Sequence, residues 1–264
     1  MMKPIRVAVV GVGHLGSIHA RIYSQLQEIQ LVAVCDLLPE RAAAVATQFN
    51  CAAVTDSREL LDRVDAVSIA VPTQAHFPVA KTFLSRGIHA LVEKPITSTV
   101  READQLLKLA QKSGAILQVG HVERFNVTLR RVQDSLKEPR FIEAHRLAPF
   151  QPRGTEVGVV LDLMIHDIDL LLWLVKNPIR KVEAVGVRVL TPFEDIANAR
   201  ITFRNGAVAN LTASRISKEG MRKFRIFQPD SYISMDFLAS PSISSDIRRD
   251  EFSTRILPFP ERSP

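Results

Sequence analysis

The stretch Gly11-Val12-Gly13-His14-Leu15-Gly16 decides the fold of the N-terminal half. It follows the apolar run 6–10 and opens a helical pattern over 14–26. A G-x-G-x-x-G motif alone is a weak signal, but between a strand and a helix it is typical of a dinucleotide-binding unit. A glycine turn in a similar fold that binds another ligand is the alternative.

The individual positions of the motif have separate physical roles. Gly11 permits the tight turn, Gly13 lets the backbone approach a pyrophosphate, and Gly16 allows close packing of helix on sheet. His14 and Leu15 begin the helix, whose free N–H groups and dipole favour an anion. We therefore predict that all five positions bind the cofactor.

Asp36 ends the next apolar run, 20 residues after Gly16. Its carboxylate is predicted to accept hydrogen bonds from the adenosine ribose hydroxyls. A 2′-phosphate there would meet like charge, costing about 3 kcal/mol per unit charge at about 5 Å and an effective dielectric near 20. NAD is therefore predicted in preference to NADP, with Arg41 as an expected but distant compensating charge.

Buried strands and helices alternate over residues 1–120, which predicts a doubly wound parallel sheet, a Rossmann domain. The expected strands are 6–10, 31–35, 66–70, 89–92 and 115–118, and the expected helices are 14–26, 39–49, 74–86 and 99–113. Thr99 and Glu102 have the spacing of a capping box, and Gly114 ends that helix.

The pattern changes at His121, so residues 121–264 are predicted to form a separate α+β domain. Strands follow one another after Lys181, and Arg204-Asn205-Gly206 is a hairpin signal, which together predict an open, mostly antiparallel sheet. A helix at 127–135, a strand at 141–146 and a long helix at 161–174 precede these strands.

Composition excludes several classes of protein. The chain has 264 residues, 46% apolar and 6% aromatic, and a formal charge of +6 that is spread along its length. This composition argues against disorder and against a nucleic-acid partner, because nucleic-acid binders concentrate charge on one element. Cys35 and Cys51 are expected to be buried thiols, and no membrane segment or signal peptide is evident, so we expect a cytoplasmic protein.

Four further segments, in order, carry a family resemblance. They are Val71-Pro72-Thr73 with His76, Glu93-Lys94-Pro95, Gly120-His121-Val122-Glu123-Arg124-Phe125-Asn126, and Asp162 to Asp169. With the glycine motif, the sequence resembles the glucose–fructose oxidoreductase / inositol dehydrogenase (Gfo/Idh/MocA) superfamily. The resemblance implies an NAD-dependent oxidoreductase that acts on CH–OH groups, with a C-terminal substrate-binding and oligomerisation domain.

The resemblance also implies roles for single residues. Lys94 would reach both cofactor and substrate, and Asp162 and His166 would be catalytic. Positions that would line the nicotinamide half of the cofactor are Pro72, Thr73, His76, Glu93 and Lys94.

Elementary chemistry agrees with a catalytic group on the long helix. Asp162, His166 and Asp169 are spaced to share one helix face. Oxidation of an alcohol needs a base, for which His166 suits best, while Lys94 could stabilise an alkoxide or share the proton. A polar helix stripe exposed to solvent is the competing interpretation. His121, Glu123, Asp162 and His166 match no compact metal motif, so no metal is predicted. His19 and His89 are predicted to be structural.

Within the superfamily, residues 120–126 and 143–169 are similar to the UDP-N-acetylglucosamine 3-dehydrogenases. That similarity implies oxidation at C3 of the sugar in lipid A precursor synthesis, with a PLP-dependent aminotransferase as functional partner. Arg124, Arg146 and Arg153 would suit a diphosphate, although each could equally form a salt bridge. The predicted substrate-binding residues are His121, Arg124, Asn126, Arg153, Asp162 and His166.

Two other functions remain open on the sequence. One is a dehydrogenase of a free sugar or inositol, and the other is a non-catalytic NAD-sensing regulator with the same fold. Lys94, Asp162 and His166 argue against the regulator, because a sensor needs no base. The resemblance further implies a homodimer or homotetramer, and relative to the family the chain is expected to be short at its C-terminus.

Overall fold

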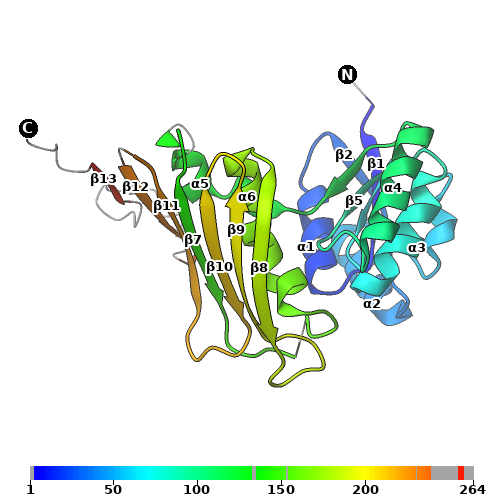
Figure 1. The fold of residues 1–264 in the computed structure, drawn as a ribbon. Coiled ribbons are helices and arrows are strands. Elements are labelled where there is room, and N and C mark those ends of the chain that lie inside the picture. Colours follow the sequence, from blue (N-terminus) through cyan, green and yellow to red (C-terminus); the bar gives the residue numbers. More distant parts are fainter. Residues whose placement is uncertain (1–2, 133–134, 153, 230, 239–254, 259–264) are drawn as a thin grey trace, which may run out of the picture. The chain divides into compact units, whose positions relative to one another are not determined.

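The computed structural model describes residues 3–132, 135–152, 154–229, 231–238 and 255–258. The chain separates into two compact units, 1–120 and 121–264. Figure 1 shows one sheet in each unit.

The first unit is a parallel sheet covered by helices. In the described residues its strands lie in the order β3-β2-β1-β4-β5-β6, and every pair is parallel. The strands are β1 (Ile5–Val10), β2 (Ile29–Cys35), β3 (Ala52–Val54), β4 (Ala66–Ile69), β5 (His89–Val92) and β6 (Leu117–Val119). The helices are α1 (His14–Tyr23), α2 (Pro39–Phe49), α3 (Thr73–Leu84) and α4 (Val100–Ser113), with a short 3₁₀ turn η1 (Ser57–Leu60). The predicted doubly wound domain is confirmed.

Local sequence signals explain the ends of α4. Thr99 Oγ1 accepts the Glu102 N–H at 3.3 Å, and Glu102 Oε2 accepts the Thr99 N–H at 3.1 Å, which completes the capping box. Gly114 ends the helix with φ +71°. The sequence analysis missed β3, because three residues, Ala52-Ala53-Val54, give too short a pattern to recognise.

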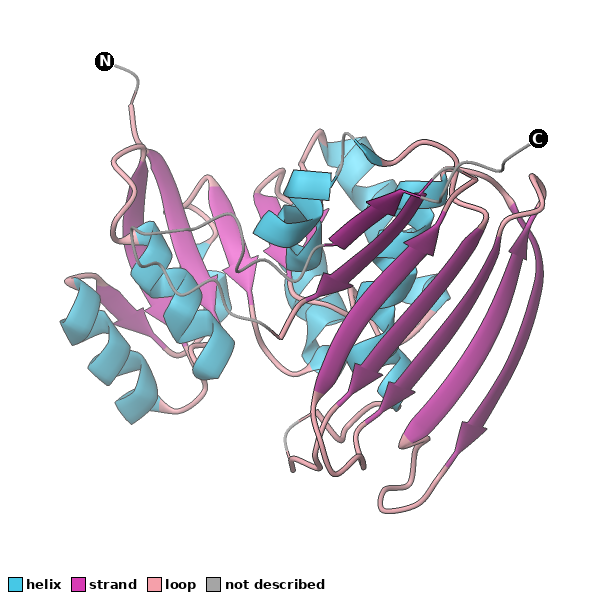
Figure 2. Cartoon of the chain, turned by 90° about the vertical axis from the view of Figure 1, so that its left-hand side faces the viewer, coloured by secondary structure: helices cyan, strands magenta, loops and turns pink. Residues whose placement is uncertain are grey.

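The second unit is built on a mixed sheet, in the described order β13-β12-β11-β7-β10-β9-β8 (Figure 2). β7 and β10 run parallel and the other neighbours antiparallel, so the sheet is mostly antiparallel as predicted. Its strands are β7 (Phe141–Leu147), β8 (Ile179–Val187), β9 (Ile196–Phe203), β10 (Val208–Ser214), β11 (Met221–Phe227), β12 (Ser231–Asp236) and β13 (Arg255–Pro258). The sequence analysis did not predict β13.

Helical segments cover one face of this sheet. They are η2 (Val122–Phe125), α5 (Val127–Val132), η4 (Val160–Met164) and α6 (Ile165–Val175). Along β9, the inward residues Ala197, Ala199, Ile201 and Phe203 are buried, while Asn198 and Arg200 face outward. This alternation is the pattern of a sheet with one face on a core.

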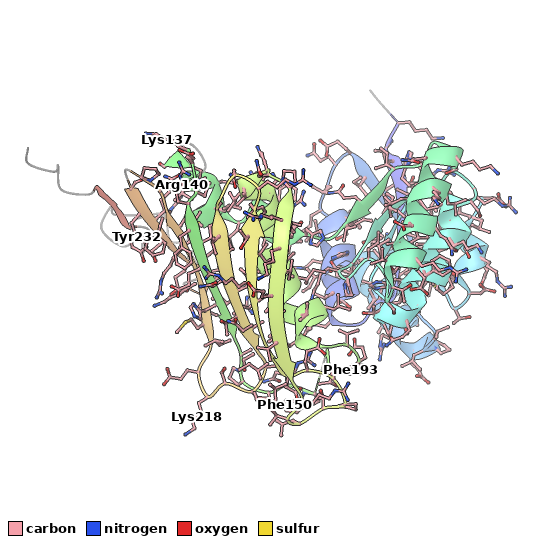
Figure 3. All side chains as sticks on the ribbon, in the orientation of Figure 1. Lys137, Arg140, Phe150, Phe193, Lys218 and Tyr232 are labelled. Atoms are coloured by element: carbon pink, nitrogen blue, oxygen red, sulfur yellow. The ribbon has the colours of Figure 1, made fainter. Side chains whose placement is uncertain are left out.

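The two ends of this sheet carry different loops. Lys137 and Arg140 lie at the end where β7 begins (Figure 3). Phe150, Phe193 and Lys218 lie at the opposite end, in the loops between strands. The segment that leads from β7 to Asp162 starts at this second end.

Candidate functional site

The glycine turn after β1 leaves no room for side chains at two positions. Gly11 has φ +83°, and a Cβ there would lie 2.8 Å from the Ala70 carbonyl oxygen. A Cβ on Gly16 would lie 1.8 Å from the Gly11 carbonyl oxygen. These contacts show why the turn and the close approach of α1 to the sheet need glycine.

Gly13 differs from its two neighbours in the motif. Among the described residues, nothing lies within 4 Å of the position of its Cβ. His14 and Leu15, both exposed, follow in the first turn of α1. The open space beside the helix N-terminus therefore fits a pyrophosphate, which needs backbone N–H groups and close approach.

Asp36 lies directly after β2 and is only 8% exposed. Its Oδ2 accepts the Val12 N–H at 3.0 Å, and its Oδ1 accepts the Leu38 N–H at 3.0 Å. Arg41 Nη1 lies 3.4 Å from Asp36 Oδ2, so the expectation that Arg41 is distant is wrong. α2 begins at Pro39, and its first turn brings Arg41 back toward Asp36.

The loop after β4 and the start of α3 contain three of the predicted cofactor residues. Pro72 is exposed, Thr73 begins α3 and is 6% exposed, and His76 is 1% exposed. His76 Nδ1 lies 2.8 Å from the Pro95 carbonyl oxygen, and its Nε2 lies 2.9 Å from the Val71 carbonyl oxygen. Both ring nitrogens contact the backbone, so His76 holds two loops together and does not present its ring to a ligand.

Glu93 and Lys94 follow β5 at the same edge of the sheet. Glu93 is 8% exposed, and its Oε2 accepts the Lys94 N–H at 3.2 Å. His19 Nε2 lies 3.2 Å from Glu93 Oε1. Burial raises the pKa of Glu93, but the hydrogen bonds from His19 and the Lys94 N–H, with the charge of Lys94, outweigh burial and hold the pKa below its usual value.

The sequence analysis placed His19 among the structural residues and so missed its contact with Glu93. A signal was present: Gly16, Ala20 and Tyr23 have the helical spacing of the sheet-facing side of α1, and His19 lies among them. A histidine on an apolar helix face needs polar partners, and here these are Ser68 and Glu93.

In the second unit, Asp169 lies close to two residues that were predicted to bind the substrate, Arg124 and His121. Arg124 donates from Nε to Asp169 Oδ2 at 2.7 Å and from Nη2 to Oδ1 at 2.5 Å. His121 Nδ1 lies 3.8 Å from Asp169 Oδ2. Asp169, 8% exposed, therefore fixes Arg124, while the Arg124 side chain remains 42% exposed and open to a ligand.

Asp162 and His166 are half-buried at the junction of η4 and α6. The predicted long α-helix begins here as a π-helical turn, η4, before it continues as α6. A π turn holds more residues than an α turn and shifts Asp162 around the axis relative to His166. A Cβ on Gly154, which has φ +80°, would lie 3.0 Å from Asp162 Oδ2.

The three remaining candidates for substrate binding, Arg146, Asn126 and Arg153, differ in their surroundings. Arg146 is 3% exposed and bonds Asp167 through Nε and Nη2, so it forms the buried salt bridge that was the alternative to diphosphate binding. Asn126 accepts the Thr128 N–H at 3.0 Å and so caps α5. Arg153 lies outside the described residues.

Three further expectations concern the burial of the cysteines, a metal site and membrane-spanning helices. Cys35 is buried, whereas Cys51 is half-buried, which corrects the expectation for Cys51. Within the described ranges, no three His, Cys, Asp or Glu side chains converge as a metal site would require. Across the same part of the chain, no helix is long and apolar enough to cross a membrane.

Strand order, the glycine turn and the acid after β2 together define a dinucleotide-binding domain, followed by a domain with an open sheet. Comparison with known families agrees for both. Residues 5–121 match the oxidoreductase family with an NAD-binding Rossmann fold, and residues 111–230 match the GFO/IDH/MocA C-terminal domain. The chain belongs to the GFO/IDH/MocA oxidoreductase family.

Individual relatives differ in similarity. UDP-N-acetylglucosamine 3-dehydrogenase of Acidithiobacillus ferrooxidans is 46% identical over 238 residues, which cover 90% of this chain and 75% of the relative. Its solved structure matches with a TM-score of 0.85, covering 90% of this chain and 78% of that one. Inositol 2-dehydrogenase 4 of Saccharopolyspora erythraea is 32% identical over 70% of this chain and 57% of its own length.

Proposed function

We propose that this chain is an NAD-dependent dehydrogenase that oxidises the C3 hydroxyl of UDP-N-acetylglucosamine to a ketone. The observation that carries the proposal is the 46% identity to the Acidithiobacillus ferrooxidans enzyme of that name, which extends through both domains. The inositol dehydrogenase compared above is less similar and aligns over less of the chain.

The residues of the first unit fit NAD. Gly11, Gly13 and Gly16 would receive the pyrophosphate at the start of α1, and Asp36 would accept hydrogen bonds from the adenosine ribose. When bound, NAD supplies the acceptor for the hydride that leaves the substrate carbon. The carboxylate of Asp36 favours NAD over NADP, although Arg41 lies nearer than expected.

Three residues are assigned to the chemistry. His166 takes the proton of the sugar hydroxyl as general base, because an imidazole titrates near neutral pH. Asp162 orients the imidazole or relays its proton. Lys94 stabilises the developing alkoxide and then the carbonyl oxygen through its positive charge.

Substrate binding is assigned to residues of the second unit. Arg124 is the best-supported, because Asp169 orients its guanidinium while part of the side chain stays exposed. Its Nε and Nη2 bond Asp169, so Nη1 and the second Nη2 hydrogen remain to donate to the diphosphate of a nucleotide sugar. His121, Asn126 and Arg153 complete the assigned set, with Asn126 also capping α5.

The product defines the next step. A 3-keto sugar is an electrophile that a PLP-dependent aminotransferase can convert to a 3-amino sugar, and we place this pair of reactions in lipid A precursor synthesis. A cytoplasmic location is consistent with the free thiols of Cys35 and Cys51. A homo-oligomer is consistent with β8, where Val182 is 55% and Val185 61% exposed.

The test is a substrate panel assayed for NADH formation. UDP-N-acetylglucosamine, other UDP-sugars, glucose and myo-inositol are each incubated with NAD, with and without the aminotransferase and its amino donor. We expect NADH only with UDP-N-acetylglucosamine, increased by the aminotransferase because it removes the ketone. NADH formation with myo-inositol or glucose alone would overturn the proposal.

Matched histidine variants test the assigned base. His166→Ala is expected to lower kcat by about 100-fold or more, the usual contribution of a general base. His89→Asn is the control, because His89 accepts the Ile116 N–H at 2.9 Å and asparagine retains an acceptor. Full activity in His166→Ala would assign the base elsewhere, whereas a parent that binds NAD but oxidises no substrate of the panel would favour the NAD-sensing regulator.

A further inference from the structure

A network of polar side chains lies in the interior of the first unit. It starts on α1, where His19 Nδ1 lies 2.6 Å from the hydroxyl of Ser68 on β4. At the other side of the ring, His19 Nε2 lies 3.2 Å from Glu93 Oε1. His19 therefore joins α1, β4 and the residue that follows β5.

The partners of His19 determine its hydrogen-bond roles. An ionised carboxylate only accepts, so His19 Nε2 donates to Glu93. Ser68 is fully buried, and its hydroxyl can donate to His19 Nδ1. In this arrangement His19 donates to Glu93 through Nε2 and accepts from Ser68 at Nδ1.

Glu93 has little freedom apart from this contact. A Cβ on Gly120 would lie 2.9 Å from Glu93 Oε1, so the backbone of Gly120 closes over the carboxylate. The second oxygen accepts the Lys94 N–H. One carboxylate therefore connects the imidazole of His19 with the backbone of Lys94.

The position of Glu93 after β5 relates its contact with His19 to the binding of the nicotinamide half of the cofactor. The adenosine end of a dinucleotide belongs over β2 at Asp36, and the pyrophosphate belongs at the start of α1. The nicotinamide half must then extend past β4 toward β5, because the ligand crosses the sheet where the strand order reverses. Glu93 and Lys94 directly follow β5, on that side of the sheet.

We propose that His19 is a positioning residue for the nicotinamide half of the cofactor. Its Nε2–H holds the Glu93 carboxylate, and through it the Lys94 backbone, in the arrangement that the nicotinamide end and the hydride transfer require. The inference rests on the proposed function for its kinetic consequence, but its binding consequence needs only the NAD domain.

Substitution of His19 by glutamine or asparagine tests its contacts with Glu93 and Ser68 separately. In His19→Gln, the amide reaches the position of Nε2 and can still donate to Glu93. In His19→Asn, the shorter side chain reaches the position of Nδ1 and can contact Ser68 but not Glu93. His19→Ala removes both contacts. Thermal unfolding of each variant establishes that it is folded.

The first readout is binding of NADH and of ADP-ribose, which lacks nicotinamide. We expect the Asn and Ala variants to bind NADH about tenfold more weakly, and ADP-ribose within about twofold of the parent. The Gln variant is expected to bind both as the parent does. Equal losses in the Gln and Asn variants would overturn the inference, as would parental NADH binding by the Ala variant.

The second readout is kcat with UDP-N-acetylglucosamine. We expect kcat to fall about tenfold in the Asn variant and to be retained within about threefold in the Gln variant. If His19 served only to anchor α1 on Ser68, the Asn variant would be the better one, and this outcome also contradicts the inference. If the parent oxidises no UDP-sugar, the proposed function fails, and the ratio of NADH to ADP-ribose affinity still decides the role of His19.

Discussion

Asp36 Oδ2 accepts a hydrogen bond of 3.0 Å from the backbone N–H of Val12. This bond joins the end of β2 to the glycine turn after β1, so the carboxylate that we propose to bind the adenosine ribose is fixed by the turn that we propose to bind the pyrophosphate. We therefore expect the preference for NAD over NADP to depend on the charge of the side chain at position 36 more than on its shape.

Asp36→Asn is the first predicted change. Asparagine can still accept the Val12 N–H but carries no charge, so the repulsion of a 2′-phosphate disappears. Removing about 3 kcal/mol per unit charge predicts an increase of about 100-fold in the preference for NADP over NAD. The measurement is the ratio of kcat/KM for the two cofactors.

The size of the increase in NADP preference in Asp36→Asn depends on Arg41. Once Asp36 is neutral, the Arg41 guanidinium is released from its 3.4 Å contact and can pair with the phosphate. Adding Arg41→Ala to Asp36→Asn should therefore remove much of the gain. Arg58→Ala is the control, because Arg58 pairs with Asp56 on the surface. An unchanged NADP preference in Asp36→Asn would contradict the assigned role of Asp36.

The second prediction compares two glycines of one motif. Gly16→Ala places a methyl group 1.8 Å from the Gly11 carbonyl oxygen, and such overpacking costs about 1–3 kcal/mol. Tm should fall by about 2–10 °C. Gly13→Ala has space in the free protein, so its Tm should stay within about 1 °C, while its methyl group blocks a pyrophosphate.

Thermal unfolding and NADH titration distinguish the two glycine variants. We expect Gly13→Ala to lose NADH affinity by about tenfold or more without loss of stability, since the methyl group occupies the space of the pyrophosphate. Parental affinity in Gly13→Ala would show that the pyrophosphate lies elsewhere.

The parts of the structure that local sequence determines were predictable. The glycine turn and the Thr99–Glu102 capping box depend on residues within a few positions of one another. The π turn at Asp162 and the contact of His19 with Glu93 were not predictable, because both depend on what packs against them. Glu93 is 74 residues from His19, and only the sheet brings the two together.

The third prediction concerns Asp195, which is fully buried between β8 and β9. Its Oδ2 accepts the N–H groups of Val189, Leu190 and Thr191 at 2.8, 2.6 and 2.9 Å. Burial raises the pKa of Asp195, but these bonds outweigh burial and hold the pKa far below its usual value. The folded state therefore binds fewer protons here than the unfolded state, and the carboxylate stabilises the fold above the unfolded pKa.

Asp195→Asn should lower Tm at pH 7 because it removes this carboxylate. The difference in Tm from the parent should shrink as the pH falls below about 4, where the stabilisation of the parent by Asp195 is progressively lost. The exposed Asp62→Asn is the control and should leave Tm unchanged at both pH values. A Tm difference that is the same at pH 7 and at pH 3.5 would contradict this account.

The last prediction compares two ion pairs whose arginines, Arg146 and Arg225, lie on the neighbouring strands β7 and β11. Arg146 Nη2 lies 2.8 Å from Asp167 Oδ1, and both side chains are about 5% exposed or less. Arg225 Nη1 lies 2.7 Å from Glu143 Oε2, with both side chains 31% exposed. The distances are nearly equal, so the comparison is between a buried pair, whose Arg146 Nη1 also lies 3.1 Å from Glu123 Oε1, and a half-exposed pair.

Arg146→Met should cost about 3–5 kcal/mol of unfolding free energy, because it leaves the buried Asp167 carboxylate without its cation. Arg225→Met should cost about 1 kcal/mol or less, since water can solvate Glu143. Adding Asp167→Leu to Arg146→Met should recover part of the loss, because no buried charge then remains at this pair. Urea unfolding of the four proteins measures these differences, and equal losses from Arg146→Met and Arg225→Met would show that the distance between the charges matters more than their burial.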